Sequence, residues 1–158
     1  MKIFIVRHAS AVERFSWNGN DTDRPLDDEG SNQSLMIAKY FSDTEISSIF
    51  CSAAVRCQQT IWPTAHQFGI QIELSNSLSE GSTSQTSDLL EKLAQGEISD
   101  ASPILCSHGD VISELIRSLT LKGMSTPKRK GFAKASVWEL SFSNGTIESG
   151  LYHDSHLR

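Results

Sequence analysis

Ile3-Phe4-Ile5-Val6-Arg7-His8-Ala9, close to the start of the chain, is an apolar run that opens directly onto an arginine and a histidine. The run predicts a buried strand over residues 2–6 that brings a guanidinium and an imidazole to one end of a sheet. In open α/β sheets, sites form in the crevice beyond the carboxyl ends of the strands. The pair Arg7-His8 is therefore our first candidate for a functional site.

The size and charge of the chain limit its class. Its 158 residues favour a single domain over residues 1–158, with one sizeable core. The formal net charge of −5 argues against a nucleic-acid surface, which normally carries a basic patch. The one basic cluster, Lys128-Arg129-Lys130, is interpreted as a solvated loop, with the further hypothesis that it steers an acidic partner.

The cysteines and the apolar segments indicate where in the cell the protein is found. Cys51, Cys57 and Cys106 are odd in number and lack the close pairing of metal ribbons and redox motifs, which favours reduced thiols in a cytoplasmic protein. The first residues lack the apolar length of a secretory signal. No segment has the length and apolar character of a membrane span, so we expect no membrane partner.

Short apolar runs alternate with longer helical patterns, as in βαβ units. We predict an α/β protein with three layers, a mixed and mostly parallel sheet of about six strands covered by helices on both faces. The expected strands are 2–6, 47–51, 70–74, 103–107, 136–142 and 146–151. The expected helices are 28–41, 53–67, 84–95 and 110–121.

Single residues refine this outline. Asn144-Gly145 predicts a tight hairpin, so the last two strands should be antiparallel. Asp110 is expected to cap the helix that begins at Val111, and Pro63 to end or kink the second helix. Residues 9–27 show no period and predict a long loop, a kind of segment that is often functional.

Five polar residues follow predicted strands. Arg7 and His8 end the first, Arg56 begins the helix after the second, Glu80 follows the third and His108 follows the fourth. Parallel strands open at the same edge, so two arginines, two histidines and a carboxylate should meet in one crevice. Phosphoryl transfer to a side chain needs such a set, namely a nucleophile, several donors for the phosphoryl oxygens and a proton donor.

The order of these motifs resembles the histidine phosphatase superfamily. The motifs are Val6-Arg7-His8-Ala9, Arg24-Pro25-Leu26 with Gly30, Ser52 and Arg56 with Gln59-Thr60, Glu80, and Ser107-His108-Gly109. The short length, the Arg-His-Ala and the Arg-Pro-Leu are similar to the small bacterial phosphohistidine phosphatases of the SixA type. The resemblance implies a phosphoglycerate mutase-like fold and a role in signalling.

The resemblance also implies roles for residues. His8 would be the nucleophile, and Arg7, Arg56 and His108 would form the phosphate pocket with it. Glu80 would be the proton donor, and no metal or other cofactor would be needed. Mutase-like members have a phosphate-binding asparagine in the first loop, whereas the matching place here lies near Arg14, with Asn18 and Asn20 further on.

The short chain suggests that the capping insertions of larger superfamily members are absent. An open, shallow site would then favour a phosphorylated side chain of another protein, and phosphohistidine fits because its imidazole leaving group needs little acid assistance. The alternatives are a phosphatase of small phosphorylated molecules, a phosphoglycerate mutase-like enzyme, and a non-catalytic module that binds phosphoproteins.

Three other chemistries are disfavoured. Cys51 and Arg56 are separated by four residues, whereas the cysteine phosphatase loop has five, and both Cys51 and Cys106 are expected in the core. A metal hydrolase would need ligands such as His8, His108 and Asp110, with His66, His153 and His156 in reserve, and none has close metal-ligand spacing. No glycine-rich nucleotide loop is present in the sequence.

Overall fold

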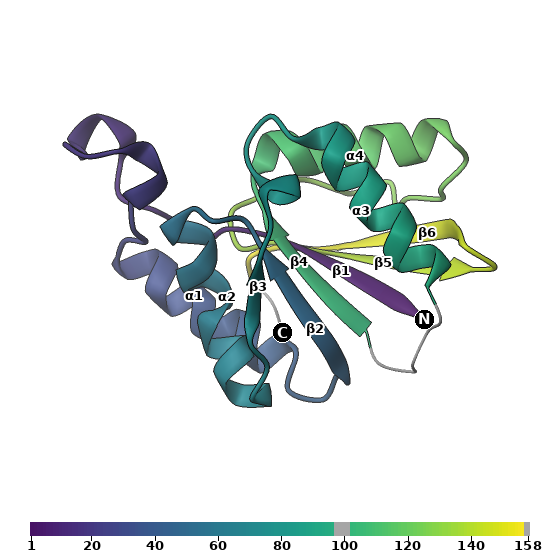
Figure 1. The fold of residues 1–158 in the computed structure, drawn as a ribbon, viewed down its shortest axis with the longest axis horizontal. Coiled ribbons are helices and arrows are strands. Elements are labelled where there is room, and N and C mark those ends of the chain that lie inside the picture. The colour runs from purple at the N-terminus through teal and green to yellow at the C-terminus, as the bar shows by residue number, and fades with distance from the viewer. Residues whose placement is uncertain (97–101, 157–158) are drawn as a thin grey trace.

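A six-stranded sheet with the order β3-β2-β4-β1-β5-β6 forms the centre of the protein (Figure 1). The structure is a computed structural model that describes residues 1–96 and 102–156. Strands β1 to β4 run parallel to one another, while β5 runs antiparallel to both β1 and β6. The expected mixed and mostly parallel sheet is therefore confirmed.

The elements lie close to their expected positions. The strands are β1 (Lys2–Arg7), β2 (Ile46–Cys51), β3 (Ile72–Leu74), β4 (Ser102–Ser107), β5 (Val137–Ser143) and β6 (Thr146–His153). The α-helices are α1 (Asp28–Tyr40), α2 (Val55–Phe68), α3 (Thr83–Gln95) and α4 (Gly109–Leu121). Three short 3₁₀ turns complete the described elements, η1 (Arg14–Ser16), η2 (Asp21–Asp23) and η3 (Asn76–Leu78).

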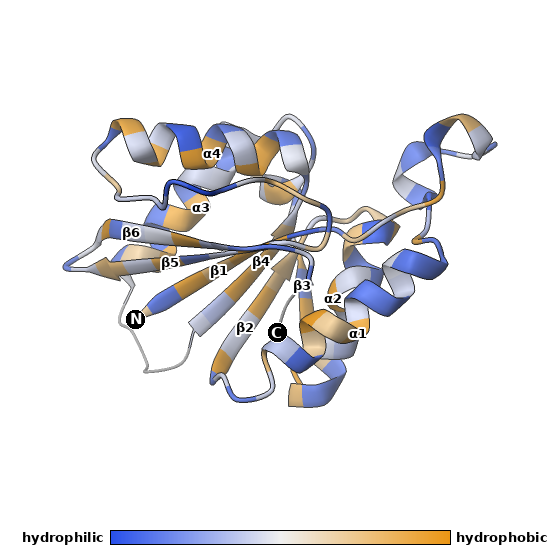
Figure 2. Ribbon diagram, turned by 180° about the vertical axis from the view of Figure 1, so that it is seen from behind, coloured by the Kyte–Doolittle hydropathy of each residue, from blue (hydrophilic) through white to orange (hydrophobic). Residues whose placement is uncertain are grey.

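Alternation along β1 divides the core into two layers. Phe4 and Val6 pack with Ile37 of α1 and Ile61 of α2 on one face of the sheet. Ile3 and Ile5 point to the other face, where the core cluster includes Leu90 of α3 and Ile112, Leu115 and Ile116 of α4. Because successive strand residues face opposite sides, a continuous apolar run needs cover on both. Figure 2 shows the resulting apolar strands between the helices.

Pro63 was expected to end or kink helix α2 near Trp62, and the helix does not end there. Helix α2 continues to Phe68 and ends at Gly69, which has a φ of 64°. Proline in a helix interior costs about 3 kcal/mol because it removes one hydrogen bond and crowds the preceding turn. Burial of Ile61 and Ala65 on either side of Pro63 offsets this cost.

The expected hairpin is confirmed. Asn144 and Gly145 both have positive φ, 49° and 75°, and β5 and β6 pair in antiparallel register on either side of them. Cys51 and Cys106 are fully buried in the core, as expected. No helix within residues 1–96 and 102–156 is long and apolar enough to cross a membrane.

Residues 9–27 form an irregular arm, as the sequence predicts, and carry η1 and η2. The arm projects from the body of the protein as the purple coils of Figure 1. A bridge between Ala11 and Leu26 closes its base, where Arg24 Nη1 also donates to the carbonyl of Val12 at 2.8 Å. The amide of Leu26 donates to Oε1 of Gln59 at 2.8 Å and so attaches the arm to α2.

Candidate active site

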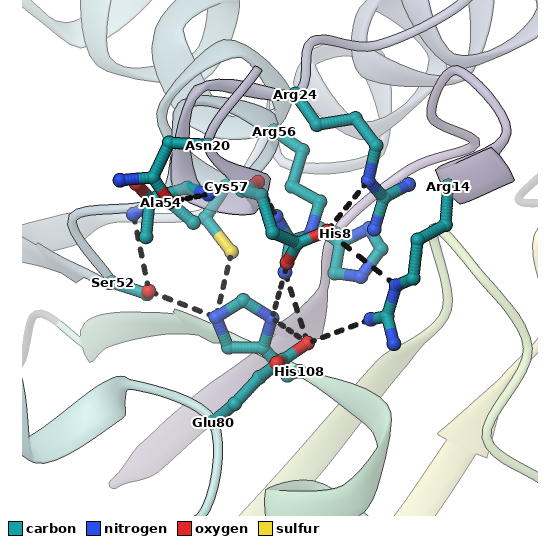
Figure 3. A network of polar contacts seen from close by, with 12 residues as sticks. His8, Arg14, Asn20, Arg24, Ser52, Ala54, Arg56, Cys57, Glu80 and His108 are labelled. Carbon is teal, nitrogen blue, oxygen red and sulfur yellow. Dashed lines mark hydrogen bonds and ion pairs between the residues drawn. The ribbon is translucent and has the colours of Figure 1, made fainter. Parts of the chain in front are cut away.

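The carboxyl ends of β1, β2 and β4 bring the predicted site residues together. Arg7 pairs with Ser107 in the parallel register of β1 and β4, so His8 and His108 follow at the same level. Their ring centroids are 5.4 Å apart. Arg56 reaches the same place from the first turn of α2, after β2. Glu80 approaches from the segment between η3 and α3. Figure 3 shows the side chains of His8, Arg56, Glu80 and His108 close together.

His8 is oriented by the backbone that follows it. Its Nδ1 lies 2.8 Å from the carbonyl of Ala9, an acceptor, so Nδ1 carries the proton and Nε2 keeps a free lone pair. The amide of Ala9 in turn donates to Oγ1 of Thr60 at 2.8 Å. This chain of hydrogen bonds determines which nitrogen of His8 keeps its lone pair.

Burial keeps His8 neutral. The pKa of His8 is lowered from 6.5 to about 3, first by burial and then by the nearby charges of His108, Arg56 and Arg7, while the hydrogen bond with Ala9 opposes the shift. Burial and like charge both disfavour the protonated imidazole. The Nε2 lone pair of His8 is therefore available throughout the neutral pH range.

The guanidinium of Arg7 packs directly against Gly109. A Cβ added at Gly109 would lie 2.7 Å from Cζ of Arg7 and 2.8 Å from its Nε, closer than side chains approach one another. The Nη1 of Arg7 donates to the carbonyl of Phe132. The glycine of the Ser107-His108-Gly109 motif thus makes room for the arginine of the first motif.

Arg56 is only 1% exposed and is surrounded by acceptors. Its Nη1 donates to the Asp21 carbonyl at 2.9 Å, and its Nη2 donates to Oδ2 of Asp21 at 3.2 Å and to Oε1 of Glu80 at 2.9 Å. The buried Nε atoms of Arg7 and Arg56 have no hydrogen-bond acceptor within the described part of the chain. A bound phosphoryl group has three oxygens that can accept from such donors.

His108 is held from behind by Ser52. Oγ of Ser52 lies 2.9 Å from Nε2 of His108, and Sγ of Cys57 lies 3.6 Å from the same nitrogen. The opposite nitrogen, Nδ1, faces Nη2 of Arg56 at 3.4 Å and Oε1 of Glu80 at 3.5 Å. The imidazole therefore presents Nδ1 to the centre of the site, where it can donate a hydrogen bond to an anion when protonated.

Glu80 lies where the sequence places it, and its carboxylate contacts several basic side chains. Besides Arg56 and His108, its Oε1 is 3.7 Å from Nη2 of Arg14. Its side chain is 47% exposed, so protons can exchange with water. This position suits a group that passes a proton to a leaving group or takes one from water.

Sequence reasoning missed the contribution of the arm. Asp21 pairs with Arg24 at 3.0 Å, Arg56 at 3.2 Å and Arg14 at 3.4 Å. Although burial raises the pKa of Asp21, the hydrogen bond from Arg24 and the surrounding positive charges lower it overall. An acidic residue in an aperiodic loop carries no local signal of such a role, because its partners come from other segments.

One expectation for a single residue needs correction. Helix α4 begins at Gly109 with His108 as its N-cap, so Asp110 lies in the first turn and does not cap the helix. Its carboxylate instead accepts from the amide of Gly81 at 3.0 Å, and this contact joins α4 to the segment of Glu80. Asn20 caps η2 and accepts from the indole of Trp17 at 2.9 Å, so it supports the arm.

A polar pocket of about 450 Å³ opens beside His8 and His108. Its lining adds basic and acidic side chains to these two imidazoles: Arg7, Arg14, Arg24 and Lys134, with Glu13, Glu80 and Asp110. Arg56 is not part of this lining and lies behind Glu80, to which it donates. Lys134 is a further residue that the sequence did not single out, whereas Lys128, Arg129 and Lys130 lie outside this lining. No group of three or more His, Cys, Asp or Glu suitable for a metal ion occurs among the residues that the structure describes.

The family follows from this geometry together with the sequence. The profile of the histidine phosphatase superfamily (branch 1) matches residues 3–98, more than half of the 158 residues. The chain therefore belongs to the histidine phosphatase superfamily. The resemblance that the motifs indicate is confirmed at this level, and the fold is the phosphoglycerate mutase-like fold.

Solved structures and a curated relative are similar to this chain. The structure of the protein histidine phosphatase SixA in complex with tungstate has a TM-score of 0.76 and 22% identity, with 98% of this chain and 95% of that chain covered. Mycobacterial glucosyl-3-phosphoglycerate phosphatase in complex with VO₃ has a TM-score of 0.74 and 16% identity, with 96% of both chains covered. At these identities the likeness shows a shared fold.

The 8-oxo-(d)GTP phosphatase of Mycolicibacterium smegmatis is 28% identical over 151 residues, which are 95% of this chain and 47% of that protein. The chain thus spans about half the length of the curated relative it matches.

Proposed function

We propose that this protein is a metal-independent phosphatase that transfers a phosphoryl group to His8 and then to water. The observation that carries the proposal is the state of His8, neutral because of burial and with Nε2 free because Nδ1 donates to the carbonyl of Ala9. A module that only binds phosphate would gain nothing from a nucleophile prepared in this way, which disfavours the binding-module alternative.

In the first step, Nε2 of His8 attacks phosphorus, and the bond from phosphorus to the leaving group breaks. Arg7, Arg56 and His108 donate hydrogen bonds to the phosphoryl oxygens, where charge is spread in the transition state. Glu80 supplies a proton when the leaving group needs one.

In the second step, water attacks the phosphorus of phospho-His8 and Glu80 accepts its proton. The proton on Nδ1 of His8 makes the phosphorylated ring an imidazolium, which departs as neutral imidazole when the P–N bond breaks. The hydrogen bond to Ala9 therefore serves both steps.

We infer that the physiological substrate is a phosphohistidine of another protein. The similarity to the fold of SixA, a protein histidine phosphatase, supports this choice, and the match covers 98% of this chain and 95% of that chain. Two fold neighbours were solved with tungstate and with VO₃, oxyanions that resemble phosphate. The name of the 28% identical relative, an 8-oxo-(d)GTP phosphatase, favours small phosphorylated molecules as the second candidate.

A trapping experiment tests the mechanism. Rapid acid-free quenching during turnover of a ³²P-labelled aryl phosphate should yield an acid-labile, base-stable phosphate on His8, and His8→Ala should remove both the label and the activity. Arg56→Ala should retain the fold and lose about 10²–10³-fold in kcat/KM, as expected when a donor to transition-state charge is removed. EDTA should leave the rate unchanged. A His8→Ala variant with wild-type turnover would refute the mechanism.

A further inference from the structure

A second hollow lies beside the phosphate pocket, at the base of the projecting arm. Its volume is about 260 Å³, and its lining consists of Arg14, Trp17, Gly19, Asp21 and Glu80. Arg14 and Glu80 also line the phosphate pocket, so the two spaces meet at these side chains. His8 lines the phosphate pocket and not this hollow.

The indole of Trp17 is held as a fixed wall of this hollow. Its Nε1 donates to the carbonyl of Asn20 at 2.9 Å. A Cβ added at Gly19 would lie 3.0 Å from Nε1 and 3.2 Å from Cε2 of Trp17, so the indole packs directly on the glycine. Phe15 lies two residues earlier on the same arm. Unlike Trp17, its side chain is 99% exposed and does not line the hollow.

Glu80 lies between the hollow and the residues that would hold the phosphoryl group. Its Oε1 is 2.9 Å from Nη2 of Arg56, which would hold the phosphoryl group, and 3.7 Å from Nη2 of Arg14, which lines the hollow (Figure 3). Displacement at phosphorus is in line, so the leaving group departs on the side away from His8. The hollow is lined by the acid and not by the nucleophile, as the place of the leaving group should be.

We propose that this hollow is the leaving-group subsite and that it accepts a planar aromatic ring, which is imidazole when the substrate is the phosphohistidine of the proposed function. Trp17 offers its face for stacking. The carboxylates of Asp21 and Glu80 accept a hydrogen bond from the second ring nitrogen. A volume of about 260 Å³ suits one ring, since sites for drug-sized ligands take about 300–1,000 Å³.

The subsite also assists the reaction. The P–N bond of the substrate breaks while a bond forms from phosphorus to Nε2 of His8, and the electron pair remains on the departing nitrogen. The substrate ring departs as neutral imidazole only when its other nitrogen carries a proton. A nearby carboxylate favours that protonated form, because an opposite charge stabilises the imidazolium.

Three small substrates with the same phosphoryl group and different leaving groups test the subsite. They are phosphoimidazole, phenyl phosphate and glycerol 3-phosphate. Trp17→Ala should lower kcat/KM about three- to ten-fold for the two ring substrates, the range that aromatic pairs provide, and should leave glycerol 3-phosphate within about two-fold. Trp17→Phe, which keeps an aromatic face, should recover most of the loss.

Phe15→Ala is the matched control, an aromatic removed from the same arm without contact to the hollow, and should leave all three rates unchanged. Inhibition by vanadate should be equal in wild type and Trp17→Ala, which shows that the phosphate pocket is intact. An equal loss by Trp17→Ala on all three substrates, or a weakened vanadate inhibition, overturns the subsite while the trapped phospho-His8 leaves the proposed function standing. Failure to trap phosphate on His8 of the wild type overturns both.

Discussion

At the scale of the residue, the chemistry of His8 depends on two contacts that have different effects. The carbonyl of Ala9 selects the tautomer, and burial among cations removes the proton that would otherwise block Nε2. An exposed histidine would be partly protonated near its ordinary pKa of about 6.5. Because the buried imidazole of His8 stays neutral in the folded protein, the free energy of unfolding depends on pH.

The free energy of unfolding should therefore fall as the pH is lowered from 7 to 5. The unfolded His8, with an ordinary pKa of 6.5, binds a proton in this range, whereas the folded His8, with a pKa of about 3, does not. Protons then stabilise the unfolded chain, and the loss should approach about 1.4 kcal/mol per pH unit below pH 6.5 and total about 2 kcal/mol between pH 7 and 5.

Guanidinium unfolding at pH 7, 6 and 5 measures this contribution. His8→Asn cannot take up the proton, so its curve should be flatter than that of the wild type by the same about 2 kcal/mol. The other titrating groups are shared by both proteins and cancel in the difference. Parallel curves would mean that the pKa of folded His8 is not depressed.

At the scale of the element, helix α2 joins Arg56, the arginine proposed to bind phosphate, to the segment that orients His8, the proposed nucleophile. Arg56 and Thr60 are one turn apart, and Oγ1 of Thr60 donates to the Arg56 carbonyl at 2.6 Å. The same oxygen accepts from the amide of Ala9 at 2.8 Å. One hydroxyl therefore connects α2 to the residue whose carbonyl holds His8.

Thr60→Val keeps the shape of this side chain and removes both hydrogen bonds. It should lower the free energy of unfolding by about 1–3 kcal/mol, because the buried amide of Ala9 loses its acceptor. It should also lower kcat, because the Ala9 carbonyl would hold His8 less firmly. Chemical denaturation and steady-state kinetics with an aryl phosphate measure the two effects.

Helix α2 supplies its own control one turn later. Thr64 is fully buried, and its Oγ1 has no hydrogen-bond partner within residues 1–96 and 102–156. Thr64→Val should therefore be neutral or stabilising, with unchanged kinetics. Equal destabilisation by the two substitutions would contradict the role assigned to Thr60.

At the scale of the whole molecule, the site exists because the sheet order places β1 between β4 and β5, with β2 on the far side of β4. The residues proposed to bind phosphate thus come from three parts of the fold, with Arg7 on β1, Arg56 on α2 and His108 after β4. A phosphate ion held by all three would connect parts of the chain that are separate in the unfolded state.

Inorganic phosphate or vanadate should consequently stabilise the folded protein. At a ligand concentration of 100 times Kd the gain should be about 2.7 kcal/mol, seen as a higher Tm by calorimetry. Arg56→Ala should abolish the increase, and chloride at the same ionic strength is the control for general salt effects. A Tm that rises equally with chloride would show that no specific anion site is present.

Sequence alone determined the order and type of the elements, the Asn144-Gly145 hairpin, and the identity of Arg7, His8, Arg56 and His108 as the core of the candidate site. These features have local signals, because apolar periodicity and motif spacing follow from neighbouring residues. The expected helix over 53–67 agrees with α2, and the alternative that Pro63 ends it fails because tertiary burial of the helix outweighs a local penalty.

Tertiary structure alone decided how those residues act. It lowered the pKa of His8, placed Gly109 against the Arg7 guanidinium, and brought Asp21 to Arg56 and Trp17 to the hollow beside Glu80. Each of these contacts joins groups through space. Arg7 and the carbonyl that it binds are 125 residues apart in the sequence, and no local pattern can encode their proximity.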